Sequence, residues 1–121
     1  MKKLLYSLTC LLLLVCCSCS SGHKRAADHY MQSMANRDYE KASYYCGVSK
    51  DLTSKQLMIT MILEKYGDNI RSFTIKSDSI FPDKQNAVVM MDIFYTNNTK
   101  DENVPIYTEK MGDRWIVSPF K

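Results

Sequence analysis

The chain contains few of the residues on which metal centres and catalytic triads depend. Its 121 residues include two histidines, His23 and His29, with no second cluster of ligands elsewhere. Such a pair completes neither a zinc site nor a catalytic triad. The four glycines form no phosphate-binding loop. We therefore expect neither a metal ion nor a cofactor.

Neither sign of charge dominates the sequence. The 16 basic side chains include Lys2 and Lys3, and the 13 acidic ones are interspersed with lysines along the rest of the chain. The one local basic cluster is His23-Lys24-Arg25, which we expect to lie in a solvated tether. Because nucleic-acid binding needs a larger basic patch, we exclude nucleic acid as a partner.

A long transmembrane run is also missing, although the chain starts with an apolar segment. Lys2 and Lys3 precede an apolar run from Leu4 to Val15, and a small residue, Ser18, follows it. The run is shorter than the roughly 20 residues that span a bilayer. This pattern is typical of a cleaved secretory signal.

The cysteine cluster Cys16-Cys17-Ser18-Cys19 resembles a lipobox, in which small residues precede a cysteine that becomes acylated. We expect Cys19 to carry the lipid, with residues 1–18 as signal, 19–24 as a short tether and 25–121 as one domain. Cys17 stays an alternative, because Cys16 stands where a lipobox usually carries leucine. The resemblance implies a protein anchored in a bacterial cell envelope. The lack of an acidic pair after Cys19 favours the periplasmic side over the cell surface.

Removal of the signal and acylation of Cys19 would leave one free thiol in the chain. Of the five cysteines, three leave with the signal and Cys19 is acylated, so Cys46 has no internal partner for a disulfide. No Lys, Arg or His adjoins Cys46 to lower its pKa. We expect it to be a buried structural residue.

Helical spacing covers the first half of the remaining chain. Recurrence at i, i+3, i+4 and i+7 predicts one buried helical face, formed by Ala27, Tyr30, Met31 and Met34. Asp38 is placed to cap a second, short helix that Gly47 ends, and the buried side of this helix is Tyr39, Ala42, Tyr45 and Cys46. A capping box over Thr53–Gln56 predicts a third helix from Thr53 to Gly67, with an inner side of Leu57, Met58, Met61, Ile62 and Tyr66.

Beyond Gly67 the apolar period changes to two, which predicts strands. Phe73 and Ile75 alternate with polar residues, and the later strands are expected at about 87–96, 103–110 and 114–120. Short turns separate them. We expect an α+β fold with three helices packed on a four-stranded antiparallel meander.

This order of elements resembles NTF2-like, or cystatin-like, domains. The segments that carry the likeness are 30–45, the strand 86–95 and the ending Gly112-Asp113-Arg114-Trp115-Ile116-Val117. They are similar to small lipoproteins of Bacteroides-type bacteria called DUF4878-like. The resemblance implies a curved sheet around the helices, with a cone-shaped interior walled by Tyr30, Met34, Met58, Met61, Phe94 and Trp115.

We interpret the domain as a non-catalytic module that binds either a small apolar ligand or an envelope protein. A core filled by those aromatic and methionine side chains is an alternative to an open pocket. A purely structural or inhibitory role is a third reading, and it predicts a filled interior with an exposed apolar patch.

An enzymatic alternative uses Asp92 as a general base. Asp92 shares a strand face with Val88, Met90 and Phe94, and an acid among apolar groups has a raised pKa. The opposite register turns Val89, Met91 and Ile93 inward and leaves Asp92 in water.

One further motif concerns modification. Asp78-Ser79-Ile80 resembles the O-glycosylation triplet of Bacteroides-type exported proteins, which makes Ser79 a candidate acceptor.

Overall fold

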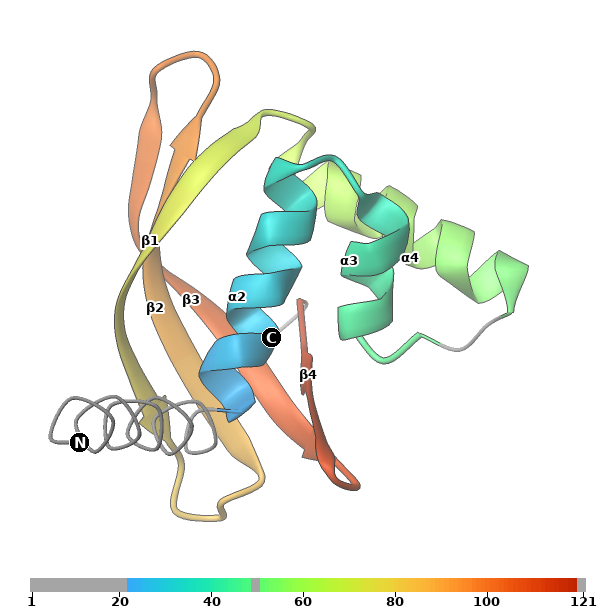
Figure 1. The fold of residues 1–121 in the computed structure, drawn as a ribbon, viewed down its shortest axis with the longest axis vertical. Coiled ribbons are helices and arrows are strands. Elements are labelled where there is room, and N and C mark those ends of the chain that lie inside the picture. The colour runs from blue at the N-terminus through green and yellow to red at the C-terminus, as the bar shows by residue number, and fades with distance from the viewer. Residues whose placement is uncertain (1–21, 49–50, 120–121) are drawn as a thin grey trace, which may run out of the picture.

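A computed structural model describes residues 22–48 and 51–119, which form three helices followed by four strands (Figure 1). This order confirms the predicted α+β class. Cys19 and the apolar segment before it lie outside the described residues. The elements are α2 (Gly22–Ala35), α3 (Tyr39–Tyr45), α4 (Leu52–Tyr66), β1 (Ile70–Ile80), β2 (Asn86–Tyr95), β3 (Lys100–Met111) and β4 (Arg114–Val117).

The inner face of α2 is the one that the sequence predicted. Its four members, Ala27, Tyr30, Met31 and Met34, are all buried in the core. The helix starts at Gly22, however, so the end of the segment expected as a tether is helical. His23 is buried rather than solvated, because its Nε2 lies 2.6 Å from the Asp78 carboxylate and its ring packs edge-on against Trp115.

The ends of α3 also follow the prediction. The Asp38 carboxylate caps the helix by accepting a hydrogen bond of 3.2 Å from the Lys41 amide. Gly47 follows with φ of +77°, a left-handed conformation that favours glycine. Local sequence chemistry therefore sets both ends of this short helix.

The start and inner side of α4 differ from the prediction. Asp51 caps the helix through the Ser54 amide and hydroxyl, so the capping box at Thr53 was wrong. Of the predicted inner side only Ile62 is buried, and Leu57 is 61% exposed. The reason is tertiary, since the first half of α4 extends beyond the rest of the domain and has little to pack against (Figure 1).

The sheet is an antiparallel meander in the order β1-β2-β3-β4. Val89, Met91 and Ile93 of β2 point toward the helices and are buried. Two strands contain an extra residue opposite the middle of β2, since register shifts occur between Ile75 and Ser77 in β1 and between Val104 and Asp101 in β3. These bulges let the sheet curl around α2.

The core lies between the concave sheet face and α2, which contacts all four strands. Helix α3 packs beside α2, and α4 packs on α3 and reaches the core near its C-terminal end through Met58, Ile62 and Tyr66. No helix within the described residues is long and apolar enough to cross a membrane.

Candidate functional site

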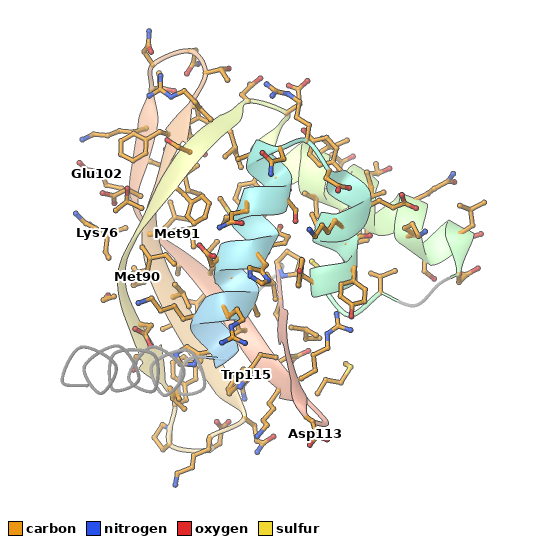
Figure 2. The ribbon with its side chains drawn as sticks, viewed as in Figure 1. Lys76, Met90, Met91, Glu102, Asp113 and Trp115 are labelled. Carbon is orange, nitrogen blue, oxygen red and sulfur yellow. The ribbon has the colours of Figure 1, made fainter. Side chains whose placement is uncertain are left out.

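The predicted pocket residues do not surround one cavity. Tyr30 and Met34 are fully buried among other core side chains, and Met58 packs partly buried against them. Met61 is half-buried on α4. Phe94 follows core-facing Ile93 and therefore points to the opposite side of the sheet. Trp115 packs at the start of α2, where it contacts Gly22 and His23 (Figure 2).

Among the described residues, one crevice reaches the core. It lies beside Tyr66, is lined by Ile106 and Val117 among others, and has no volume for even a water-sized molecule. Two buried hydroxyl oxygens among the described residues have no partner, that of Tyr30 in the core and that of Tyr39 packed against it, and burial raises the pKa of both groups. Burial also raises the pKa of the Cys46 thiol to about 12, so Cys46 is not a nucleophile at neutral pH.

Asp92 lies on the convex face of the sheet, between the bulges of β1 and β3. Its Oδ1 accepts a hydrogen bond of 3.0 Å from the Asn103 amide, and its Oδ2 lies 3.3 Å from the Lys76 ammonium. Lys76 is the extra residue of the β1 bulge, and Asn103 has φ of +55° in the β3 bulge. The Asp92 carboxylate thus links these two bulges.

This arrangement overturns the raised pKa that the enzymatic alternative requires. The hydrogen bond from Asn103, with the positive charge of Lys76, holds the pKa of Asp92 below its ordinary value despite the opposing effect of desolvation. The structure has the other register, in which Val89, Met91 and Ile93 face inward. Asp92 was expected to be solvated in that register, but it is buried. Sequence reasoning missed the cause, which is a pair of bulges that periodicity does not reveal.

The histidines form separate contacts rather than a catalytic group. His29 Nδ1 lies 3.2 Å from the Tyr45 hydroxyl, and His23 contacts Asp78. In residues 22–48 and 51–119, no serine or cysteine side chain is hydrogen-bonded to a histidine ring, and no three potential metal ligands gather. Ser79 is exposed on the edge strand β1 and remains a predicted modification site.

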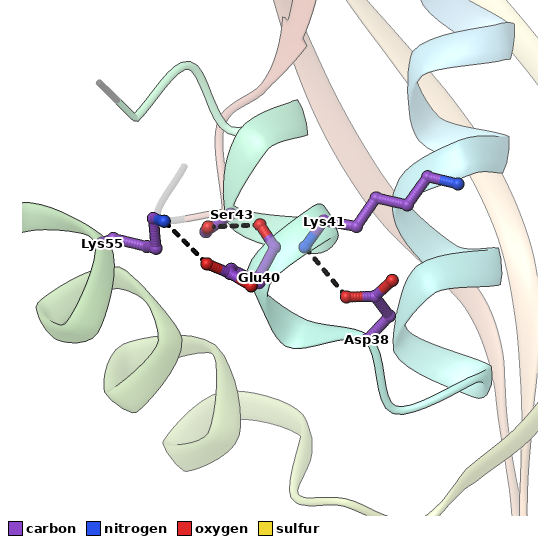
Figure 3. A network of polar contacts seen from close by, with 5 residues as sticks. All are labelled: Asp38, Glu40, Lys41, Ser43 and Lys55. Carbon is purple, nitrogen blue, oxygen red and sulfur yellow. Dashed lines mark hydrogen bonds and ion pairs between the residues drawn. The ribbon is translucent and has the colours of Figure 1, made fainter. Parts of the chain in front are cut away.

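A hollow lies outside the core, between α3 and the start of α4. It has a volume of about 350 Å³ and is lined by Asp38, Glu40, Lys41, Ser43, Tyr44, Val48 and Lys55. An ion pair of 2.7 Å between Lys55 Nζ and Glu40 Oε1 joins the two helices at its edge, as Figure 3 shows. Arg114 packs over the ring of Tyr44 and donates a hydrogen bond to its carbonyl oxygen.

The two helices that flank this hollow carry exposed apolar side chains, of which Tyr44 lines the hollow itself. Tyr44 is 54% exposed, Leu52 63% and Leu57 61%. Met58, Ile59 and Met61 are half-buried on the same helix. Of the 15 residues of α4, only Ile62 is buried, which is unusual for a helix with so many apolar side chains. We call Tyr44, Leu52, Leu57 and the hollow beside them the α3–α4 surface.

Sequence comparison gives no relative from which a role could be taken. No protein-family profile and no curated protein matches the sequence. A structural match was found to the crystal structure of a Campylobacter jejuni protein provisionally described as an NTF2-like transpeptidase. It has a TM-score of 0.56 and 14% identity, and covers 78% of this chain and 94% of the other. The match, the three helices and the curled four-stranded sheet together show that this domain has the NTF2-like α+β fold.

Proposed function

We propose that this chain is a lipid-anchored protein of a bacterial cell envelope, similar to DUF4878-like lipoproteins, whose non-catalytic NTF2-like domain binds another envelope protein through the α3–α4 surface. The anchor rests on the lipobox-like sequence at Cys16–Cys19, in which Cys19 is the acylated residue and Cys17 the alternative. The periplasmic side of the membrane is the proposed location.

The observation that carries the binding role is the exposure of α4. Leu52 and Leu57 project into solvent with more than half of their area accessible, while the core of the domain is complete without them. Exposed large apolar side chains on a helix that flanks a hollow are typical of a protein-binding surface. It also matches the patch expected for a role through surface contacts.

The lining of the hollow indicates the chemistry of the partner. Tyr44 and Val48 provide an apolar wall, and the charged residues of the lining are balanced, with Asp38 and Glu40 against Lys41 and Lys55. A protein that inserts an apolar side chain against Tyr44 and Val48 fits this arrangement. The ion pair between Glu40 and Lys55 bridges the two helices at the edge of the hollow.

Site-specific photo-cross-linking of the full-length protein in its native membrane tests this proposal. A photoreactive residue at Leu57 is expected to form one discrete cross-linked species, and one at Thr74 on the exposed face of β1 is expected to form none. Leu52→Ser should reduce the Leu57 cross-link without lowering Tm, because Leu52 is 63% exposed. Equal cross-linking at both positions, or no effect of Leu52→Ser, would contradict binding at this surface.

A second candidate is a small apolar ligand within the core, and the Tyr30 hydroxyl favours it. An unpartnered buried hydroxyl costs about 1–3 kcal/mol, which a ligand that accepts its hydrogen bond would relieve. Such a ligand requires the core to open, since the crevice beside Tyr66 has no free volume. Native mass spectrometry of the purified protein distinguishes the candidates, because a bound molecule of defined mass supports this one and an apo mass opposes it.

Catalysis is not part of the proposal. Nucleophilic mechanisms need a hydroxyl or thiol activated by a neighbouring base. The buried Cys46 has a raised pKa, and the lowered pKa of Asp92 makes it a weak base. We therefore do not propose for this chain the transpeptidase activity that is named in the description of the structural relative.

A further inference from the structure

The start of α2 lies at one end of the molecule, together with two strand turns. The Lys110 amide donates a hydrogen bond of 2.7 Å to the Gln85 carbonyl, which joins the end of β3 to the β1–β2 turn. His23 joins α2 to β1 through Asp78. Figure 2 shows Trp115 beside the first turn of α2 and Asp113 at the tip of the β3–β4 turn. We call this region, comprising Gly22–Arg25, Ile80–Gln85 and Met111–Arg114, the N-terminal end.

Exposed apolar side chains concentrate at the N-terminal end. Ile80 is 47% exposed, Phe81 38% and Met111 57%. Within the described part of the chain, the other strongly exposed large apolar residues are those of the α3–α4 surface. Single exposed apolar residues are common in proteins, but three at the tips of adjacent turns form a group that needs an explanation.

The β1–β2 turn presents its apolar residues in a fixed conformation. The Phe81 amide donates to the Asn86 carbonyl, and the Lys84 amide donates to the Phe81 carbonyl. The Asp83 carboxylate accepts hydrogen bonds from the Gln85 and Asn86 amides at 2.9 and 3.1 Å. The turn is thus stabilised by its own polar groups, and the apolar side chains are not needed to hold it.

The proposed lipid attachment point is close to this end. Gly22, the first residue of α2, follows Cys19 after only two intervening residues. A fully extended segment of this length spans about 10 Å. The N-terminal end therefore cannot move far from the bilayer surface when Cys19 is acylated.

We propose that the N-terminal end lies on the bilayer, with Ile80, Phe81 and Met111 inserted among the lipids; this inference rests on the lipid anchor proposed above. Charged groups accompany this apolar contact, and the basic ones, Lys24, Arg25, Lys84 and Arg114, outnumber the acidic Asp83 and Asp113. The β2–β3 turn then points away from the membrane, and α4 stays clear of it (Figure 1). This orientation leaves the α3–α4 surface accessible to an envelope protein.

Quenching of tryptophan fluorescence by brominated lipids tests the orientation. The full-length acylated protein is reconstituted into phosphatidylethanolamine–phosphatidylglycerol vesicles with bromine on the acyl chains. The Phe81→Trp variant is compared with Leu57→Trp, a matched substitution at the exposed α4 position. Unsubstituted protein gives the contribution of Trp115, the one native tryptophan.

We expect a large loss of fluorescence for Phe81→Trp and no loss beyond that of Trp115 for Leu57→Trp. The loss should persist at high salt, because salt screens the basic side chains but not the insertion of Ile80, Phe81 and Met111. Equal loss in both variants, or a greater loss for Leu57→Trp, would overturn the orientation. Flotation with the vesicles and the intact mass of the acylated chain are measured in parallel. A protein that floats without quenching at Phe81→Trp refutes the orientation alone, whereas a chain without acylation refutes the anchor and the orientation that rests on it.

Discussion

At the scale of single residues, Asp92 shows that an acid whose sequence context is typical of a catalytic residue can instead have a structural role. An acid on an otherwise apolar strand face suggested a catalytic base, but its carboxylate binds the Asn103 amide and the Lys76 ammonium at two bulges. These partners stabilise the charged form. The residue therefore belongs to the architecture of the curled sheet.

The lowered pKa of Asp92 predicts a pH dependence of stability. A depressed pKa in the folded state stabilises the protein above the ordinary pKa of about 3.9, and the stabilisation is lost as the pH falls through the folded-state pKa. Asp92→Asn keeps an oxygen acceptor for the Asn103 amide but removes the charge. Between about pH 6 and pH 3 the wild type should therefore lose more stability than the variant. Urea midpoints across this range measure the difference, and parallel curves would contradict the prediction.

Cys46 gives a second prediction for a single residue. Because burial raises the pKa of its thiol to about 12, the folded protein should react very slowly with iodoacetamide near neutral pH. In urea the same thiol should react fully. Peptide mapping of the alkylated protein measures both states, and rapid modification of the folded chain would show that Cys46 is accessible.

At the scale of elements, α3 and α4 illustrate what helix ends require. Asp38 and Gly47 terminate α3 through contacts within a few residues, so the sequence predicted both. For α4 the sequence analysis expected a cap at Thr53, and the structure uses Asp51 instead. The choice between neighbouring caps depends on where the preceding loop enters the helix, which pattern reasoning does not reveal.

Gly47 makes a testable contribution to the packing of α3 on β4. Alanine there would adopt a positive φ, which costs about 1–2 kcal/mol, and its Cβ would lie 2.8 Å from Ile116 Cδ1. Gly112→Ala is the matched control, since Gly112 also has positive φ but has nothing within 4 Å of the added Cβ. Urea denaturation should show a greater loss of stability for Gly47→Ala. Equal losses would mean that the contact with Ile116 relaxes at no cost.

At the scale of the whole molecule, the first turn of α2 connects the helices to the far edges of the sheet. His23 contacts Asp78 of β1 and the Trp115 ring of β4, the two edge strands. The end of the segment expected to be a tether, residues 22–24, is thus part of the folded domain. The lipid anchor proposed above would therefore be joined to the domain by a short tether, which would restrict the orientation of the domain.

Replacing His23 should therefore weaken the entire domain. His23→Ala removes a buried hydrogen bond and an aromatic contact, which is expected to cost about 1–3 kcal/mol. Lys24→Ala is the control, because Lys24 is exposed on the same turn. Thermal unfolding of both variants measures the effect. A Tm equal to that of the control would show that this end contributes little to folding.

The sequence alone determined the features that depend on neighbouring residues. Apolar spacing predicted the inner face of α2, and alternation with turn residues predicted the four-stranded meander. Asp38 and Gly47 predicted the ends of α3 for the same reason, because caps act within one helical turn.

Tertiary structure decided the features that depend on distant partners. The burial of His23 requires Asp78 and Trp115, and the role of Asp92 requires bulges in two other strands. The sequence did not reveal that Leu57 is exposed. Periodicity marks the apolar side of a helix, but it does not show whether another element covers that side. The predicted pocket residues lie apart from one another. Phe94 is on the convex face because of strand alternation, and Trp115 lies beside α2 because of its position in β4.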